Sequence, residues 1–291
     1  MLWKREKTTM PEEPKRYHDY NAEAEALSGN LTLPLMQEVK PPTYVKLNER
    51  GGYLSQHVEN YRLGGVVSFR SAYTQVGGNP DPKPGHGWNT LTTSVIEGLN
   101  VLDIVTADRI VCQISTDHPP LIEYVPTVTF LGTRFENLRI AGHQVKLELD
   151  LDMLGAKPKK DAGYLSDRDF QKRASTQRER LKGQKNLPAD VATYYGQASS
   201  GAGKPAPIKC SLVNQVEGGY PGRSFGHAIE VPNFGKIYLA TLTVEESDYD
   251  KPTGAPKKTT ITLKMIEMVM GCVGVGSLDG GTGKTNGGTR P

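Results

Sequence analysis

Several stretches of the chain alternate apolar and polar residues with a period of two. The clearest is QVKLELDLDML, in which Val145, Leu147, Leu149 and Leu151 lie on one face and charged residues on the other. Shorter alternation occurs in TYVKLN, GGVVSFRSAY, DRIVCQIS and TVTFLG. A strand with one buried and one wet face is typical of antiparallel sheets. The alternation therefore predicts a mainly β fold, either all-β or α+β, with antiparallel sheets packed as in a sandwich.

Glycine and proline interrupt these stretches. The 291 residues include 32 glycines and 20 prolines, which predicts many turns and few long helices. The segment 77–87, GGNPDPKPGHG, is the densest turn signal. Two short helices are expected elsewhere, one in NAEAEALSGN with its end at Gly29 and one in TSVIEGLNVLD.

Residues 156–206 differ in kind from the alternating stretches. Ser166 followed by Asp169 resembles a helix N-terminal capping box, and Gly183 suits a helix end. Between them a basic helix is predicted over 167–183, with a narrow apolar stripe of Phe170, Ala174 and Leu181. Pro188 is expected to start a second short helix, before a flexible linker. We interpret the region as a helical insertion between two β segments.

The domain organisation follows from these patterns. Residues 1–40 are charged and weakly patterned, and we interpret them as an N-terminal arm. Residues 41–273 form the predicted β-rich domain, interrupted by the basic helical insertion at 156–206. Residues 274–291 are glycine-rich and are expected to form a C-terminal tail.

Charge and cysteine content constrain partners and location only broadly. The net charge is +3, yet residues 157–185 carry ten Lys or Arg against four Asp or Glu, so any basic face is local. The three cysteines, Cys112, Cys210 and Cys272, contain no CxxC pair and are expected to be reduced, mostly buried thiols. The first residues are polar, and no apolar run is long enough for a membrane span. A cytoplasmic location is expected, with non-classical export left open.

The chain ends with SLDGGTGKTNGGTRP, which contains part of a phosphate-binding loop motif. Gly283, Lys284 and Thr285 match its last three positions, but Leu278 stands where the first glycine belongs. Only six residues follow Thr285, too few for the helix whose N-terminus helps to hold the phosphates. We therefore interpret Lys284 and Thr285 as a false match, with no nucleotide or other cofactor implied.

Histidines in turn-like contexts suggest one possible enzyme site. His86, His118 and His143, together with Asp117, are the candidate metal ligands or catalytic residues. None has the HxxxH or HxH spacing of a metal site on one element. Such a site would have to be assembled from distant loops, and no motif of a cysteine or serine hydrolase accompanies it. An enzyme is left open, although the sequence favours a protein without catalysis.

Two segments carry residues favoured at interfaces. The loop GGYPGRSFGH contains Tyr220, Arg223 and Phe225. The basic helix over 167–183 contains Arg173 and Arg180, which suit an acidic protein face or a phosphate backbone. Aromatic residues typical of single-strand binding are not interleaved with its charges, so nucleic acid is the less favoured partner.

The leading functional hypothesis is a structural, self-associating subunit of a homo-oligomeric filament, shell or ring. It rests on the two expected arms and on strands long enough to offer an edge to a neighbouring copy. The alternatives are a hydrolase or other enzyme with a loop-built His/Asp site, and a binding module for protein or nucleic acid that uses the basic helix.

Overall fold

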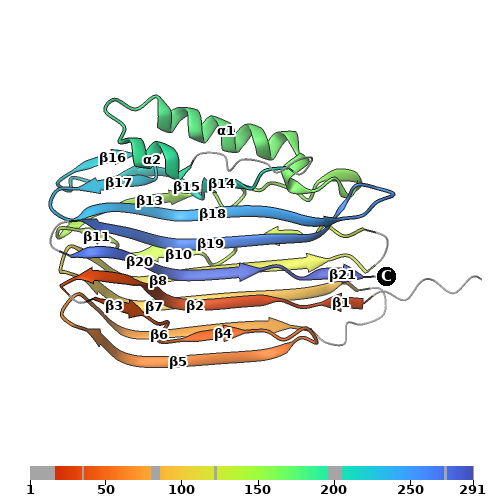
Figure 1. The fold of residues 1–291 in the computed structure, drawn as a ribbon, viewed down its shortest axis with the longest axis horizontal. Coiled ribbons are helices and arrows are strands. Elements are labelled where there is room, and N and C mark those ends of the chain that lie inside the picture. The colour runs from red at the N-terminus through yellow and green to blue at the C-terminus, as the bar shows by residue number, and fades with distance from the viewer. Residues whose placement is uncertain are drawn as a thin grey trace, which may run out of the picture.

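The chain forms a two-sheet antiparallel sandwich with helices along one side (Figure 1). The computed structural model describes residues 17–34, 36–79, 86–120, 123–195, 205–271 and 274–290. The fold is mainly β, with 58% strand and 10% helix, so the predicted fold class is confirmed. Among the described residues, no helix is long and apolar enough to cross a membrane.

The larger sheet contains eleven of the described strands. Its central path runs in the order β16 (Arg223–Phe225), β17 (Ala228–Val231), β18 (Gly235–Tyr249), β19 (Pro256–Gly271), β20 (Val275–Thr285), β2 (Ala22–Leu33) and β3 (Gln37–Val39). Four short strands extend it: β1 (Tyr17–Asp19), β4 (Tyr44–Lys46), β14 (Ile208–Ser211) and β21 (Gly288–Arg290). Its four longest strands, β18, β19, β20 and β2, lie next to one another, so they form the body of this sheet.

The second sheet faces the first and contains eight described strands. Its path is β12 (His143–Gln144), β11 (Arg139–Ile140), β8 (Val105–His118), β7 (Trp88–Val101), β6 (Val67–Gly78) and β5 (Gly52–Leu63). The short strands β9 (Thr127–Thr129) and β10 (Arg134–Glu136) also pair with β8. One edge of this sheet is therefore built from short pieces, whereas the other is the single long strand β5.

A small sheet and the helices cover the side of the sandwich opposite to β5 (Figure 1). The small sheet pairs β13 (Lys146–Leu149) with β15 (Val213–Glu217). Two single helical turns, at Lys159–Asp161 and Tyr164–Ser166, lead into α1 (Arg168–Lys182) and α2 (Ala189–Tyr194). The strand predicted in QVKLELDLDML is thus present, with Leu147 and Leu149 half-buried against the main core, but it is only four residues long.

The helical insertion folds as the capping signals predicted, with one shift. Asp167 rather than Ser166 caps α1, because its carboxylate accepts a hydrogen bond from Phe170 N at 3.0 Å. Gly183 ends α1, and Pro188 immediately precedes α2. Most of the linker predicted after α2 falls in 196–204, outside the described residues.

A line of backbone irregularities, called the crease below, crosses the long strands of both sheets. At the crease the alternation of inward and outward side chains shifts by one residue. In β7 the inward residues are Ser94 and Ile96 on one side of Gly98, and Leu99 and Val101 on the other. Gly98 has φ +66°, and this left-handed residue moves the inward set by one position. Asn60 in β5, Ala240 in β18 and Gly281 in β20 also have positive φ.

The crease explains why two helices were predicted wrongly. NAEAEALSGN lies in β2, where Ala22, Ala24 and Ala26 are buried in alternation and Leu27, directly after them, is buried as well. TSVIEGLNVLD lies mostly in β7, where Ile96 is followed by Leu99. A spacing of three between buried residues suggests a helix turn in sequence, but here it arises where a strand passes through the crease.

The predicted arm and tail are also wrong over most of their described lengths. Strands β1, β2 and β3 lie inside the predicted arm, and β20 and β21 lie inside the predicted tail. β20 pairs with β19 on one side and with β2 on the other, so it lies in the interior of the larger sheet. Residues 1–16 of the arm, and Cys272 and Val273 before the tail, lie outside the described residues. The ends are joined to the core by ladder hydrogen bonds and are not free to serve as arms along these strands.

Candidate functional site

The residues that resemble a phosphate-binding loop lie in the strand β20. In its register Lys284 lies opposite Glu23 of β2 and Thr262 of β19, and Thr285 is buried. The glycines serve packing between the sheets. A Cβ on Gly283 would lie 3.0 Å from Cys112 Sγ and 3.2 Å from Thr92 Cγ2 of the opposite sheet.

Gly283→Val is therefore expected to lower the free energy of unfolding by about 1–3 kcal/mol, through overpacking between the sheets. Denaturant unfolding measures this change. Gly271→Val is the matched control, because a Cβ at Gly271 would meet nothing within 4 Å. Equal stability of the two variants would contradict the packing explanation.

The structure brings His86, Asp117 and His118 to one end of β8 and separates them from His143. Asp117 is exposed and His118 is buried at the end of β8, and exposed His86 lies two residues before Trp88, the register partner of His118. His143 pairs with Ile140, which pairs with Val105 at the opposite end of β8. The length of β8 puts His118 and His143 about 40 Å apart. Over the described part of the chain, no group of three or more His, Cys, Asp or Glu is arranged to hold a metal ion.

His118 instead joins an aromatic cluster between the sheets. Its ring centroid lies 4.4 Å from that of His18, which stacks on Trp88 at 5.5 Å and meets the edge of Tyr20 at 4.6 Å. Burial lowers the pKa of His18 to about 4, against a smaller opposing effect of Asp19. Burial, and then the charge of His18, hold the pKa of His118 well below its usual value. Both rings are therefore neutral at pH 7, a state that suits packing.

The described cysteines are packed thiols. Cys112 and Cys210 are both buried and free. Burial raises the pKa of Cys210 to about 12 and that of Cys112 further, so neither is a thiolate at neutral pH. Cys272 lies outside the described residues.

The aromatic residues of the loop GGYPGRSFGH pack inward. Phe225 is 2% exposed in a cluster with Tyr195, and Tyr220 is half-buried against the main core. Arg223 forms an ion pair with Glu230 at 2.6 Å and lies 5.4 Å from the Phe225 ring centroid. Of the three candidates only Arg223 is left on the surface, where it is already paired.

The two candidate arginines of α1 have different environments. Arg173 donates from Nε to Met153 O at 2.9 Å and from Nη2 to Leu154 O at 2.8 Å, so it fixes the loop after β13. Arg180 is exposed and makes no ion pair with a described residue. Gln177, between them on the same face, donates to Ser211 O and accepts from Ser211 N. The helix is thus fastened to the strands below, and Arg180 remains available for a ligand.

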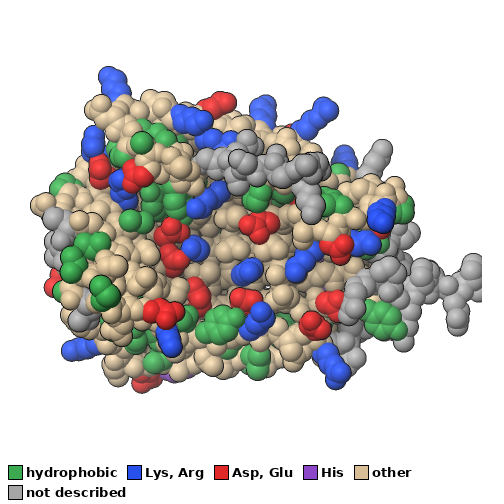
Figure 2. All heavy atoms as spheres, in the orientation of Figure 1, with side chains coloured by type: hydrophobic (Ala, Val, Ile, Leu, Met, Phe, Trp, Pro, Cys, Tyr) green, Lys and Arg blue, Asp and Glu red, His purple; other side chains and the backbone are tan. Residues whose placement is uncertain are grey.

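The outer face of the larger sheet mixes charges of both signs. Figure 2 shows Lys or Arg beside Asp or Glu across this face rather than a patch of one sign. Near its centre Lys264 lies 2.5 Å from Asp279 and 3.4 Å from Glu267. An interspersed pattern of this kind does not favour a nucleic-acid backbone on this face.

The outer edge of β5 is the longest strand edge left without a partner by the described residues. β5 has twelve residues and pairs only with β6. Residues 53–57 are exposed on both faces of the strand, including Tyr53 at 63% and Leu54 at 44%. Further along, Tyr61 stacks on Phe69 of β6 with ring centroids 4.8 Å apart, which holds that part of the strand to the sandwich. Such an edge presents a row of free backbone N–H and C=O groups.

Comparison with known families gives one match. The model of the family described as Domain of unknown function (DUF8256) matches residues 18–245. The chain belongs to this family. No curated protein and no solved structure matches it.

The matched range begins in β1 and ends within β18, so it includes all of the second sheet and α1.

The sequence analysis did not predict β5 as a candidate site. Its only signal was GYLSQHVENYRL, a stretch without proline between glycine-containing turns, and this stretch does not alternate.

Proposed function

We propose that the chain is a structural subunit that self-associates, with the outer edge of β5 pairing with β5 of a second copy. One observation carries the proposal: a twelve-residue edge strand that pairs with one described strand, β6, and is exposed on both faces over 53–57. Pairing with another strand would satisfy its backbone groups, and it would cover Tyr53 and Leu54.

A second copy of this chain is the occupant that the strand fits. Two β5 strands related by a twofold axis run antiparallel, so the same surface serves both copies. In a register centred on Val58, Glu59 of one copy lies opposite His57 of the other, and the symmetry repeats this pair. The two second sheets would then form one continuous sheet across the dimer.

The double variant Tyr53→Lys/Leu54→Lys is expected to weaken self-association at least about tenfold, because in this register residue 54 of each copy lies opposite Arg62 of the other, so a lysine there places like charges opposite each other at both ends of the interface. Mass photometry and light scattering after size exclusion, over micromolar to millimolar protein, measure the change. Leu131→Lys is the matched control, since Leu131 is 70% exposed but lies outside β5.

A wild-type chain that keeps the mass of one copy, 31.8 kDa, at millimolar concentration would contradict the proposal. A dimer that forms equally well in the wild type, in Tyr53→Lys/Leu54→Lys and in the control Leu131→Lys would also contradict it. A synthetic peptide of residues 52–63 should compete with the dimer, whereas a peptide of the same composition in scrambled order should not.

The two alternative functions have less support from the geometry. A hydrolase built on His118 and His143 would need groups that lie at opposite ends of β8. A binding module that uses the basic helix is left with the outward residues of α1, since Arg173 and Gln177 are bonded to the strands below.

A further inference from the structure

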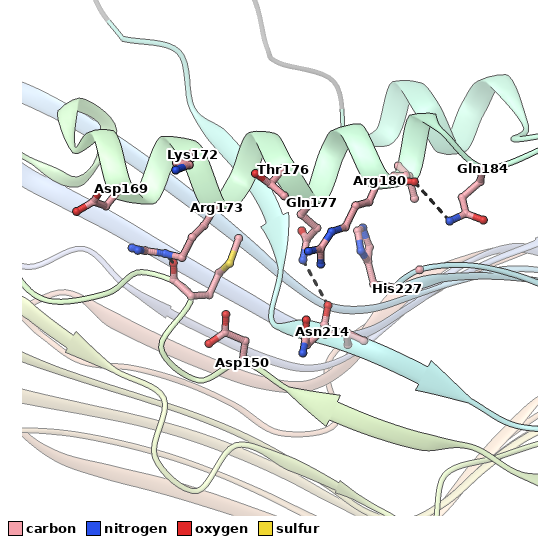
Figure 3. A pocket seen from close by; sticks show the side chains of 14 residues that line it. Asp150, Asp169, Lys172, Arg173, Thr176, Gln177, Arg180, Gln184, Asn214 and His227 are labelled. Atoms are coloured by element: carbon pink, nitrogen blue, oxygen red, sulfur yellow. Dashed lines mark hydrogen bonds between the residues drawn. The ribbon is translucent and has the colours of Figure 1, made fainter.

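A cavity lies between α1 and the strands that it covers (Figure 3). Its volume is about 430 Å³, within the range of small-molecule sites. One wall is α1, and the others come from the loop after β13, from β15 and from the turn before β17. Arg173 and Gln177 hold these walls together through their backbone hydrogen bonds. The cavity is therefore a fixed part of the fold.

His227 is a buried polar group in the wall of the cavity. It is 3% exposed, and its Nε2 has no hydrogen-bond partner among the described residues. In Figure 3 its ring points from the turn before β17 toward the C-terminal half of α1. A buried nitrogen without a partner costs about 1–3 kcal/mol, which a ligand atom at hydrogen-bond distance would recover. Burial lowers the pKa of His227 to about 3, so the ring binds as a neutral group.

The charged residues of the lining leave a small positive excess. Lys172, Arg173 and Arg180 line the cavity with Asp150 and Asp169. Arg173 is committed to backbone carbonyls, and Asp150 accepts a hydrogen bond from Asp152 N within its own turn. Arg180 and Lys172 make no ion pair with any residue in the described ranges. Of these two cations, Arg180 is the one that lies next to the buried imidazole (Figure 3).

The remaining lining includes apolar side chains. Met153, Leu181 and Val213 contribute to the walls, and all three are nearly fully buried. This surface suits the hydrocarbon part of a ligand better than water.

We infer that the α1 cavity binds a small organic monoanion with an apolar body, of the class of a medium-chain carboxylate. Arg180, which lies next to His227 in Figure 3, neutralises the anionic head. His227 Nε2 bonds a polar atom of the ligand, and the apolar body lies against Met153, Leu181 and Val213. A single negative charge matches the excess of one positive charge in the lining.

Octanoate is the probe for this inference, with binding measured by titration calorimetry on the full chain. Saturable binding of one octanoate per chain is expected for the wild type. Arg180→Gln and His227→Phe should each weaken it about tenfold, because each removes one directed polar contact. Lys182→Gln, an exposed change on the same helix outside the cavity, should leave the affinity unchanged.

Absence of saturable binding at millimolar octanoate would overturn the inference, as would equal affinity in all four proteins. Arg180 is exposed, so the Arg180→Gln variant keeps the test valid if His227→Phe fails to fold. The variant Tyr53→Lys/Leu54→Lys should bind octanoate like the wild type, because α1, which forms one wall of the cavity, and β5 lie on opposite sides of the molecule (Figure 1). The outcome is therefore independent of whether the chain self-associates.

Discussion

A chain truncated after Gly271 is expected not to fold, although the residues removed look like a glycine-rich tail. The truncation removes β20, whose eleven residues pair with β19 on one side and β2 on the other. It also removes Leu278, which is completely buried in the main core. The loss of two ladders and their packing exceeds the roughly 5–15 kcal/mol that typically stabilises a folded domain.

Far-UV circular dichroism and a thermal unfolding curve test this expectation directly. The truncated chain should show no cooperative unfolding transition, whereas full-length Lys284→Ala should unfold close to the wild type, because Lys284 is only partly buried. A truncated chain that melts cooperatively near the wild-type temperature would mean that β20 is dispensable. The same truncation cannot serve as an assembly test, since it would remove the sheet before it removed an interface.

The sequence predicted the fold class because alternation and capping are local signals. In DRIVCQIS of β8 the alternate residues Ile110, Cys112 and Ile114 are fully buried as predicted, although Val111 is buried too. Gly183 and Pro188 stand at the helix boundaries predicted from them. Both signals depend on neighbours a few residues away, which any window of the sequence contains.

The crease and the glycines of β20 were not predictable in the same way. Ile96 and Leu99 are both buried because Gly98 between them has φ +66°, and the ladders that join β7 to β6 and to β8 are both interrupted at Gly98. No local pattern in the sequence marks Gly283 as a packing residue, because a glycine is needed there only to let Cys112 approach from the other sheet. These features are set by residues that are distant in sequence, and a local pattern does not contain them.

The candidate site at β5 escaped prediction for a related reason. Its first half is wet on both faces, so polar and apolar residues do not alternate there, and no signal separates GYLSQHVENYRL from a loop. The cavity under α1 was not predicted, but Arg180, one of the residues that line it, was among the predicted binding residues. His227 was not, because its burial depends on contacts with Tyr195, thirty-two residues earlier in the chain.

Lowering the pH from 7 to 5 is expected to reduce the free energy of unfolding by several kcal/mol. Burial lowers the pKa of His18 to about 4 and of His227 to about 3, and it holds the pKa of His118 well below its usual value. The unfolded chain takes up these protons near pH 6.5 and the folded chain does not, so stability is lost as the pH falls below about 6.5. His18 and His227 each contribute about 2 kcal/mol of loss between pH 7 and 5, and His118 acts in the same direction.

Glu246 acts in the opposite direction. Burial raises its pKa to about 7, so at pH 5 the folded chain holds a proton that the unfolded carboxyl partly releases. Glu246 alone would raise the free energy of unfolding by about 2 kcal/mol between pH 7 and 5. This gain is smaller than the combined loss caused by the histidines.

The variant His18→Phe separates the histidine effect from other acid effects. Phenylalanine keeps the ring contacts with Tyr20 and Trp88 but cannot take up a proton. Denaturant unfolding at pH 7 and at pH 5 should show that this variant loses about 2 kcal/mol less than the wild type on acidification. His143→Phe is the control, because His143 is exposed and should leave the difference between the two pH values as in the wild type. If His18→Phe and the wild type lose the same stability on acidification, protonation of His18 in the unfolded chain is not a cause of the acid sensitivity.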